Sequence, residues 1–160
     1  GQYITLPGCG VAGIDIMIHK HYKSSNQFPD FYLLDKTEIN KNVYYGIEKV
    51  AAHYNSLNVA RNLLEVNGVE SSKIHTQEVT GSLIFPERKF DFIISLISWG
   101  FHYPISTYLD EVHNALFPGG ILIVDVRKKT DGESLLEKKF GPLQIIFEAQ
   151  KYRRILVIKK

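Results

Sequence analysis

The alternation of short apolar runs with longer amphipathic segments constrains the fold of this chain more than any other feature. Each apolar run is about as long as one strand, and each intervening segment has apolar residues at helical spacing. This pattern is typical of βα units around a parallel sheet. The expected strands cover residues 3–6, 31–34, 73–79, 90–96 and 121–126, and the expected helices cover residues 11–22, 56–67, 106–117 and 134–140.

Two further apolar runs, LQIIFEA and RRILVIKK, end the chain, and only Gln150–Tyr152 separates them. Strands this close in sequence form an antiparallel hairpin. Together with the five earlier strands they predict a mostly parallel seven-stranded sheet that carries one antiparallel edge pair. We expect a three-layer αβα sandwich in which residues 1–160 form one domain.

The stretch ITLPGCGVAG follows the first expected strand and contains G-x-G-x-x-G at Gly8, Gly10 and Gly13. Glycines allow a ligand to approach the backbone closely, and the next helix offers its free N–H groups to a carboxylate or phosphate. Asp35 ends the second strand about twenty residues later, where an acid can accept both ribose hydroxyls of an adenosine. Alternatively, the glycines form only a tight turn and Asp35 caps the next segment.

The segment SLISWGFHYP after the fourth strand contains candidate acceptor-side residues. His102 is a candidate general base because its ordinary pKa is near neutrality, and Tyr103 is a candidate hydrogen-bond partner for a substrate. Trp99 and Phe101 would form the wall of a pocket. In the alternative interpretation the aromatic residues pack this loop against the sheet and His102 caps a turn.

The positions of the other polar residues indicate structural roles and not catalytic ones. Asp125 and Arg127 in the fifth strand face the same side, which favours a salt bridge or a buried, hydrogen-bonded acid over catalysis. Cys9 is expected to pack in its loop as a small side chain. The histidines show no ligand spacing, so we predict no metal site.

Composition argues against several classes of protein. A single cysteine excludes an internal disulfide framework and suits a reducing compartment. We expect no secretory signal, and no apolar run in these residues approaches the roughly 18 residues of a membrane span. We therefore expect a cytoplasmic protein without membrane contact. The net charge of +2 and the absence of an Asp/Asn-Pro-Pro-Tyr-type motif argue against a nucleic-acid substrate, since the basic residues are largely scattered, with clusters at the C-terminal KYRR and KK.

Five motifs, in the order LPGCGVAG, FYLLDK, NLLEVNG, FDFIISLISWGFH and ALFPGGILIVD, resemble those of class I S-adenosylmethionine-dependent methyltransferases. The resemblance implies the strand order 3-2-1-4-5-7-6 with strand seven antiparallel. It also implies S-adenosylmethionine as cofactor and S-adenosylhomocysteine as product. On this basis the Gly8-Cys9-Gly10 loop lies beside the methionine part of the cofactor and Asp35 on its ribose. Lys36 lies next to the adenine, Ser95 and Leu96 line the cofactor, and the loop through His102 and Tyr103 faces the acceptor.

Two positions depart from the pattern of that family. Leu6 stands where an acid is usual, and Val79 stands where an aspartate often binds the adenine amino group. The neighbouring Glu78 reaches the same place after a shift of one residue, and the backbone amide of Val79 is a further candidate. The 160 residues are also expected to lack the helical segment that precedes strand one in many members.

The resemblance predicts methyl transfer to a small molecule, such as a sugar or another hydroxyl-bearing metabolite, with His102 as base. The departures at Leu6 and Val79 favour an alternative, a non-catalytic domain that keeps the fold as a scaffold or interaction module. A nicotinamide-dependent oxidoreductase is a third interpretation, which the G-x-G-x-x-G spacing supports.

Overall fold

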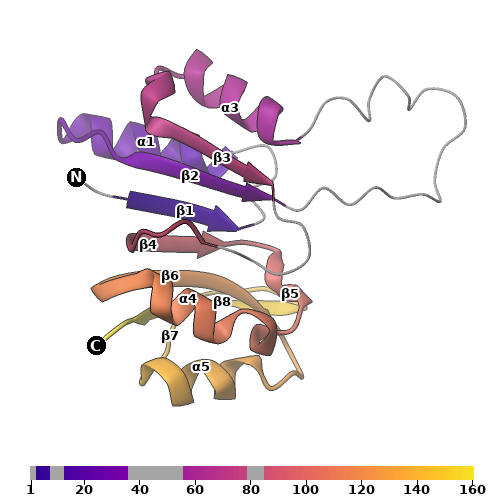
Figure 1. Cartoon of the computed structure of the whole chain (residues 1–160). Coiled ribbons are helices and arrows are strands. Elements are labelled where there is room, and N and C mark those ends of the chain that lie inside the picture. Colours follow the sequence, from indigo (N-terminus) through magenta and orange to yellow (C-terminus); the bar gives the residue numbers. More distant parts are fainter. Residues whose placement is uncertain (1–2, 8–12, 36–55, 79–84) are drawn as a thin grey trace, which may run out of the picture.

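A computed structural model describes residues 3–7, 13–35, 56–78 and 85–160 of the chain. These residues form a seven-stranded sheet with helices on both faces (Figure 1). The strands are β1 (Tyr3–Pro7), β2 (Asp30–Asp35), β3 (Ile74–Glu78), β4 (Phe90–Ser95), β5 (Ser98–Tyr103), β6 (Leu116–Arg127), β7 (Gln144–Glu148) and β8 (Tyr152–Ile158). The helices are α1 (Gly13–Ser24), α3 (Ser56–Val66), α4 (Leu109–Ala115) and α5 (Gly132–Phe140), with 3-10 turns at Ser71–Lys73 and Ile105–Thr107.

The order of strands in the sheet is β3-β2-β1-β4-β6-β8-β7. β1, β2, β3, β4 and β6 are parallel, and β8 runs antiparallel to both of its neighbours, β6 and β7. Because β5 is not a member of this sheet, β6, β7 and β8 are its fifth, sixth and seventh strands. The predicted order 3-2-1-4-5-7-6 with an antiparallel last strand is therefore confirmed.

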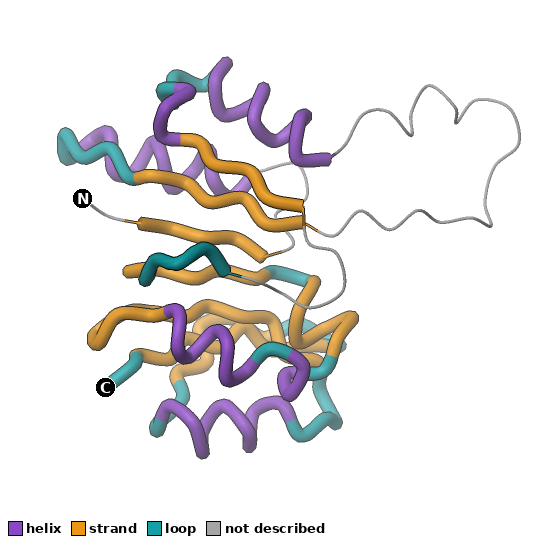
Figure 2. The backbone as a smooth tube through the Cα atoms, in the orientation of Figure 1, coloured by secondary structure: helices purple, strands orange, loops and turns teal. Residues whose placement is uncertain are grey.

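Two apolar clusters, one on each face of the sheet, form the core. Leu33 of β2 packs in the cluster under α1 and α3, whereas the next residue, Leu34, packs in the cluster under α4 and α5. This alternation follows from the period of two in a strand, which sends successive side chains to opposite faces. Figure 2 draws α1 behind the strands and α4 in front of them, so helices cover both faces of the sheet and the predicted αβα sandwich is confirmed.

The end of α3 agrees with the glycine stop in NLLEVNG. Gly68 adopts a φ of +93°, which favours glycine, and its N–H donates to the Glu65 carbonyl at 3.0 Å. The next N–H, of Val69, donates to the Leu64 carbonyl at 3.0 Å. These bonds satisfy carbonyl groups that the helix leaves without a partner.

Three predicted elements differ from those observed. The helix expected from Ser106 or Thr107 begins only at Leu109, after a 3-10 turn. Pro118-Gly119-Gly120, expected as a turn before the fifth strand, lies inside β6, where the pairing with β4 shifts between Leu116 and Ile121. The segment SLISWGFHYP, expected as a loop, contains the extended strand β5.

No helix in the described part of the chain is both long enough and apolar enough to cross a bilayer.

Candidate functional site

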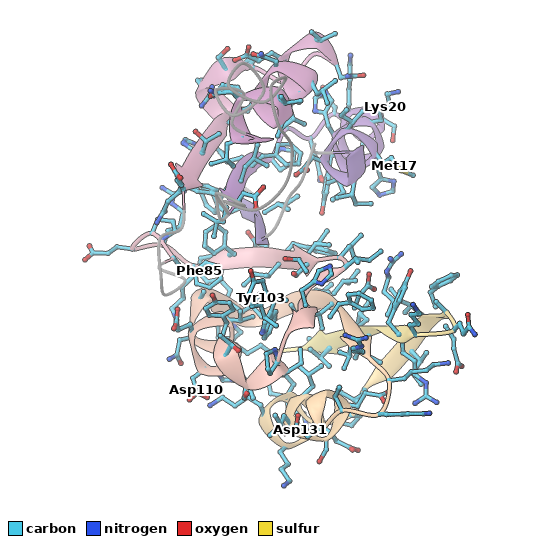
Figure 3. All side chains as sticks on the ribbon, turned by 90° about the vertical axis from the view of Figure 1, so that its right-hand side faces the viewer. Met17, Lys20, Phe85, Tyr103, Asp110 and Asp131 are labelled. Carbon is cyan, nitrogen blue, oxygen red and sulfur yellow. The ribbon has the colours of Figure 1, made fainter. Side chains whose placement is uncertain are left out.

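The carboxyl ends of the parallel strands meet at one edge of the sheet, on the right in Figure 1 and facing the viewer in Figure 3. Open α/β sheets bind ligands beyond this edge. Asp35 and Glu78 are register partners at the ends of β2 and β3, and Ser95 ends β4 opposite Val124 of β6. With Leu96, which follows Ser95, four of the predicted cofactor residues therefore belong to this edge.

Ser95 has an unusual environment for a hydroxyl group. Its residue is 1% exposed, and its Oγ has no hydrogen-bond partner among the described residues. A buried polar atom without a partner costs about 1–3 kcal/mol, so native structures usually supply one. Leu96, next to it, is half-buried against the cluster under α1. A polar ligand group at the end of β4 would satisfy the Ser95 hydroxyl.

β5 lies directly against the end of β6. A Cβ atom at Gly100 would lie 2.6 Å from the Asp125 carbonyl oxygen, so the two backbones come as close as only glycine permits. Gly100 accordingly has a φ of +88°. Trp99 is buried and its indole N–H donates to the Ile105 carbonyl at 3.1 Å. Trp99 therefore packs the segment onto the core, as the second interpretation of these aromatic residues stated, and it is not among the residues that line the cavity beside β5.

The remaining residues of β5 border a cavity of about 240 Å³. His102 is exposed, with its ring 5.0 Å from that of Phe101, and Tyr103 is half-buried against the cluster under α4 and α5. Figure 3 is viewed from the carboxyl ends of the parallel strands, and Tyr103 and Asp131 are labelled on the side that faces the viewer. The lining residues are Gly100, Phe101, His102, Tyr103, Pro104, Ile105, Arg127, Thr130 and Asp131.

Asp125 holds the connection between β4 and β5. Its fully buried carboxylate accepts the Ile97 N–H at 3.1 Å and two N–H groups of Arg154, at 2.8 Å from Nε and 3.0 Å from Nη2. The bond to this carboxylate raises the pKa of the Arg154 guanidinium above its ordinary value. The prediction of a buried, hydrogen-bonded acid is confirmed, whereas a salt bridge from Asp125 to Arg127 is wrong: the partner is Arg154, and Arg127 lies over the Phe101 ring, 5.3 Å from its centroid.

Comparison with known proteins gives no sequence relative but many structural ones. No family model matches the chain, and no curated protein sequence matches it. Among solved structures, the T. thermophilus 16S rRNA N2 G1207 methyltransferase RsmC, in complex with AdoMet and guanosine, superposes with a TM-score of 0.66 at 16% identity over 100% of this chain and 38% of that chain. The methyltransferase SibL in its apo form superposes with a TM-score of 0.66 at 15% identity, over 99% of this chain and 50% of that chain. A methyltransferase from Pyrococcus furiosus superposes with a TM-score of 0.59 at 20% identity, over 99% of this chain and 75% of that chain.

These structures superpose on nearly the whole of the chain at TM-scores of 0.59 to 0.66. The chain has the class I methyltransferase fold. It spans half or less of the length of the first two structures.

Part of the predicted site lies within the residues that the structure describes. Six of the predicted residues are described. Four belong to the carboxyl-terminal edge of the sheet, namely Asp35, Glu78, Ser95 and Leu96, and two belong to β5, namely His102 and Tyr103. Gly8, Cys9, Gly10, Lys36 and Val79 lie outside the described residues, so their predicted contacts stay predictions.

Two polar residues of α1 were not identified from the sequence. In this helix Met17 is 67% exposed, whereas Asp15 and His19 are buried. Neither carboxylate oxygen of Asp15 nor the Nε2 atom of His19 has a hydrogen-bond partner among the described residues. Burial raises the pKa of Asp15 to about 7 and lowers that of His19. The i, i+4 spacing of these two residues was the available signal.

In the ranges that the structure describes, no three His, Cys, Asp or Glu side chains gather so as to hold a metal ion.

Proposed function

We propose that this protein transfers a methyl group from S-adenosylmethionine to a hydroxyl-bearing small molecule, such as a sugar. The buried Ser95 hydroxyl at the end of β4 is the observation that carries the proposal, because it needs a polar partner at the position where the resemblance puts the cofactor. Asp35 and Glu78 at the same edge add two carboxylates that can accept hydroxyl and amino groups. The names of two structural neighbours include AdoMet and S-adenosyl-L-homocysteine.

In this proposal one group of residues binds the cofactor and another group binds the methyl acceptor. Asp35 would accept the ribose hydroxyls, Glu78 the adenine amino group, and Ser95 would bond a polar group of the cofactor. When bound, S-adenosylmethionine would supply a methyl group on a sulfonium sulfur; its transfer to the acceptor oxygen would break the carbon–sulfur bond and release S-adenosylhomocysteine. On the acceptor side, the exposed His102 would take up the proton that the hydroxyl loses, and Tyr103 would orient the acceptor. The cavity of about 240 Å³ favours a small acceptor.

Thermal unfolding with S-adenosylhomocysteine tests the proposal. We expect a millimolar concentration to raise the melting temperature, because a ligand that binds only the folded state stabilises it. Asp35→Ala should abolish the shift, since Asp35 ends β2 at the proposed site. Asp30→Ala is the matched control: it removes a carboxylate from the other end of the same strand, so the shift should persist.

A wild-type protein that shows no shift at millimolar S-adenosylhomocysteine or S-adenosylmethionine would refute the proposed activity. A non-catalytic domain with this fold would give that result. A parallel titration with NADH, followed by its fluorescence, identifies the nicotinamide alternative.

A further inference from the structure

The cavity beside β5 contains a cation that the protein does not neutralise. The Arg127 guanidinium lies 5.3 Å from the centroid of the Phe101 ring, and it makes no hydrogen bond or ion pair with any residue that the structure describes. By contrast, Arg154 bonds the Asp125 carboxylate and Arg153 bonds the Glu133 carboxylate. Among the described residues, the N–H donors of the Arg127 guanidinium therefore have no acceptor, whereas those of Arg153 and Arg154 bond carboxylates.

Tertiary structure brings a second basic segment to the same place. The strand pairing sets Arg127 opposite Tyr152, and the Lys128 N–H donates to the Lys151 carbonyl at 2.9 Å. The RKK sequence at residues 127–129 thus lies beside the KYRR sequence at residues 151–154, although 21 residues separate them along the chain. Basic residues that are apart in the sequence form one surface in the fold.

Most of this charge is compensated locally, but part of it is not. Lys128 pairs with Glu148 at 2.8 Å, and Arg153 and Arg154 pair with acids as well. In the described ranges, no ion pair involves Arg127, Lys129 or Lys151, and all three residues are exposed. Asp131 is the acid that lines the cavity, so the rim carries more unpaired positive than negative charge. Such an excess attracts anions.

The chemistry of Arg127 specifies the kind of anion. A guanidinium presents a rigid fork of N–H donors that matches the oxygen atoms of a phosphate or carboxylate. The Phe101 ring covers one side of this fork and limits its hydration. The cavity is slightly smaller than the roughly 300–1,000 Å³ of pockets that hold drug-sized ligands, so it suits a compact polar group.

We propose that Arg127 forms an anion-binding site and that the methyl acceptor is a hydroxylated small molecule bearing a phosphate or carboxylate group. The second clause rests on the proposed methyltransferase function, whereas the anion site itself does not. His102 and Tyr103 line the same cavity as Arg127, so a bound anion places the rest of a small molecule beside them. The Asp131 carboxylate offers further oxygen atoms to its hydroxyl groups, whereas the Thr130 hydroxyl already donates to the Arg127 carbonyl at 2.7 Å.

Calorimetric titration of the full chain with pyrophosphate, at ionic strength held constant with NaCl, tests the site. We expect wild-type protein to bind with a millimolar or lower Kd, and Arg127→Gln to weaken binding at least tenfold because a charge-assisted bond is lost. Lys138→Gln, an equal change of charge in the last turn of α5, should bind as the wild type does. Emission of Trp99, the single tryptophan of the chain, checks that each variant is folded.

A parallel titration with citrate shows whether the site prefers carboxylate to phosphate. The proposed site would be refuted if neither anion bound, or if Arg127→Gln and Lys138→Gln lowered the affinity equally, which indicates general charge attraction. Titration with S-adenosylhomocysteine keeps the two proposals apart. If the protein binds the anion but not S-adenosylhomocysteine, the methyltransferase function is refuted and the anion site at Arg127 is supported. If it binds S-adenosylhomocysteine but not the anion, only the anion site is refuted.

Discussion

At the scale of single residues, two glycines with similar backbones face different surroundings. Gly100 and Gly119 have φ values of +88° and +82°, a conformation that other residues adopt only with strain. A Cβ at Gly100 would meet the Asp125 carbonyl oxygen at 2.6 Å, whereas a Cβ at Gly119 would meet nothing within 4 Å. Only Gly100 is required for close packing as well as for its φ.

We predict that Gly100→Ala lowers the free energy of unfolding by about 2–4 kcal/mol, since it adds a backbone clash to the conformational strain. Gly119→Ala should cost about 1–2 kcal/mol, because it introduces the strain alone. Chemical denaturation of both variants measures the difference. Equal losses would mean that β5 does not lie as close to β6 as described.

Asp15 is a second residue whose surroundings decide its chemistry. Burial raises its pKa from 3.8 to about 7, so the folded protein binds more protons than the unfolded chain between these values. The free energy of unfolding contributed by Asp15 therefore falls as the pH rises from about 4 to about 7. The lowered pKa of His19 acts in the opposite direction, since its contribution is lost as the pH falls below 6.5.

We predict that Asp15→Asn stabilises the protein by about 2 kcal/mol at pH 8 and has little effect at pH 4, because the amide removes the charge but keeps the shape. The difference between variant and wild type, measured by denaturation across this range, isolates Asp15 from His19. His19→Gln serves as the control, as it should leave the Asp15 dependence in place. A difference that does not change with pH would contradict the buried position of the carboxyl group.

At the scale of elements, β5 depends on contacts with its neighbours. The Ile97 N–H bonds Asp125, Gly100 packs on β6, and the Trp99 indole bonds the Ile105 carbonyl. Ile97 has a φ of +48°, which is rare for a β-branched residue. The surrounding bonds therefore hold a strained connection that puts His102 and Tyr103 at the cavity.

We predict that Asp125→Ala and Arg154→Ala each cost about 2–4 kcal/mol, because each leaves one member of a partly buried ion pair without its partner. The double variant should lose less than the sum, with a coupling of about 1–3 kcal/mol. Trp99 emission should shift to longer wavelength in Asp125→Ala, where Ile97 loses its acceptor, and not in Arg154→Ala. Additive losses with unchanged emission would show that Asp125 does not anchor β5.

At the scale of the whole molecule, one edge of the sheet is unprotected. β7 is an outer strand, and its consecutive residues Ile145, Ile146 and Phe147 are 50%, 42% and 50% exposed. Exposed apolar edge strands pair readily with other strands, and charged residues on such edges normally prevent this. Glu148, the charged residue of β7, is already paired with Lys128.

We predict that the chain associates as its concentration rises and that Ile146→Lys suppresses this association, since a lysine on the edge opposes strand pairing. Val66→Lys, which adds the same charge on the exposed surface of α3, should not suppress it. Sedimentation velocity across a concentration series measures both. Wild-type protein that stays monomeric at high concentration would contradict the prediction.

Much of the architecture was predictable because it depends on local patterns. The periods of the apolar runs predicted the strands and helices, and the short interval between the last two runs predicted their antiparallel pairing. In the segment SLISWGFHYP prediction failed because contacts with residues outside the segment decided the structure. β5 is extended because Gly100 and Trp99 pack on residues of β6 and on Ile105, which no local pattern of SLISWGFHYP reveals.

The sequence by itself determined most of the segments that form strands and helices, their parallel or antiparallel direction, and that Asp35, Glu78 and Ser95 lie at or near the ends of strands. These properties follow from backbone geometry and from the spacing of apolar side chains. Tertiary structure alone decided that Asp125 pairs with Arg154, that Asp15 is buried with no partner among the described residues, and that RKK and KYRR meet beside Arg127. The reason is physical: a pKa, an ion pair or an anion site depends on distance and burial, and residues far apart in sequence set both.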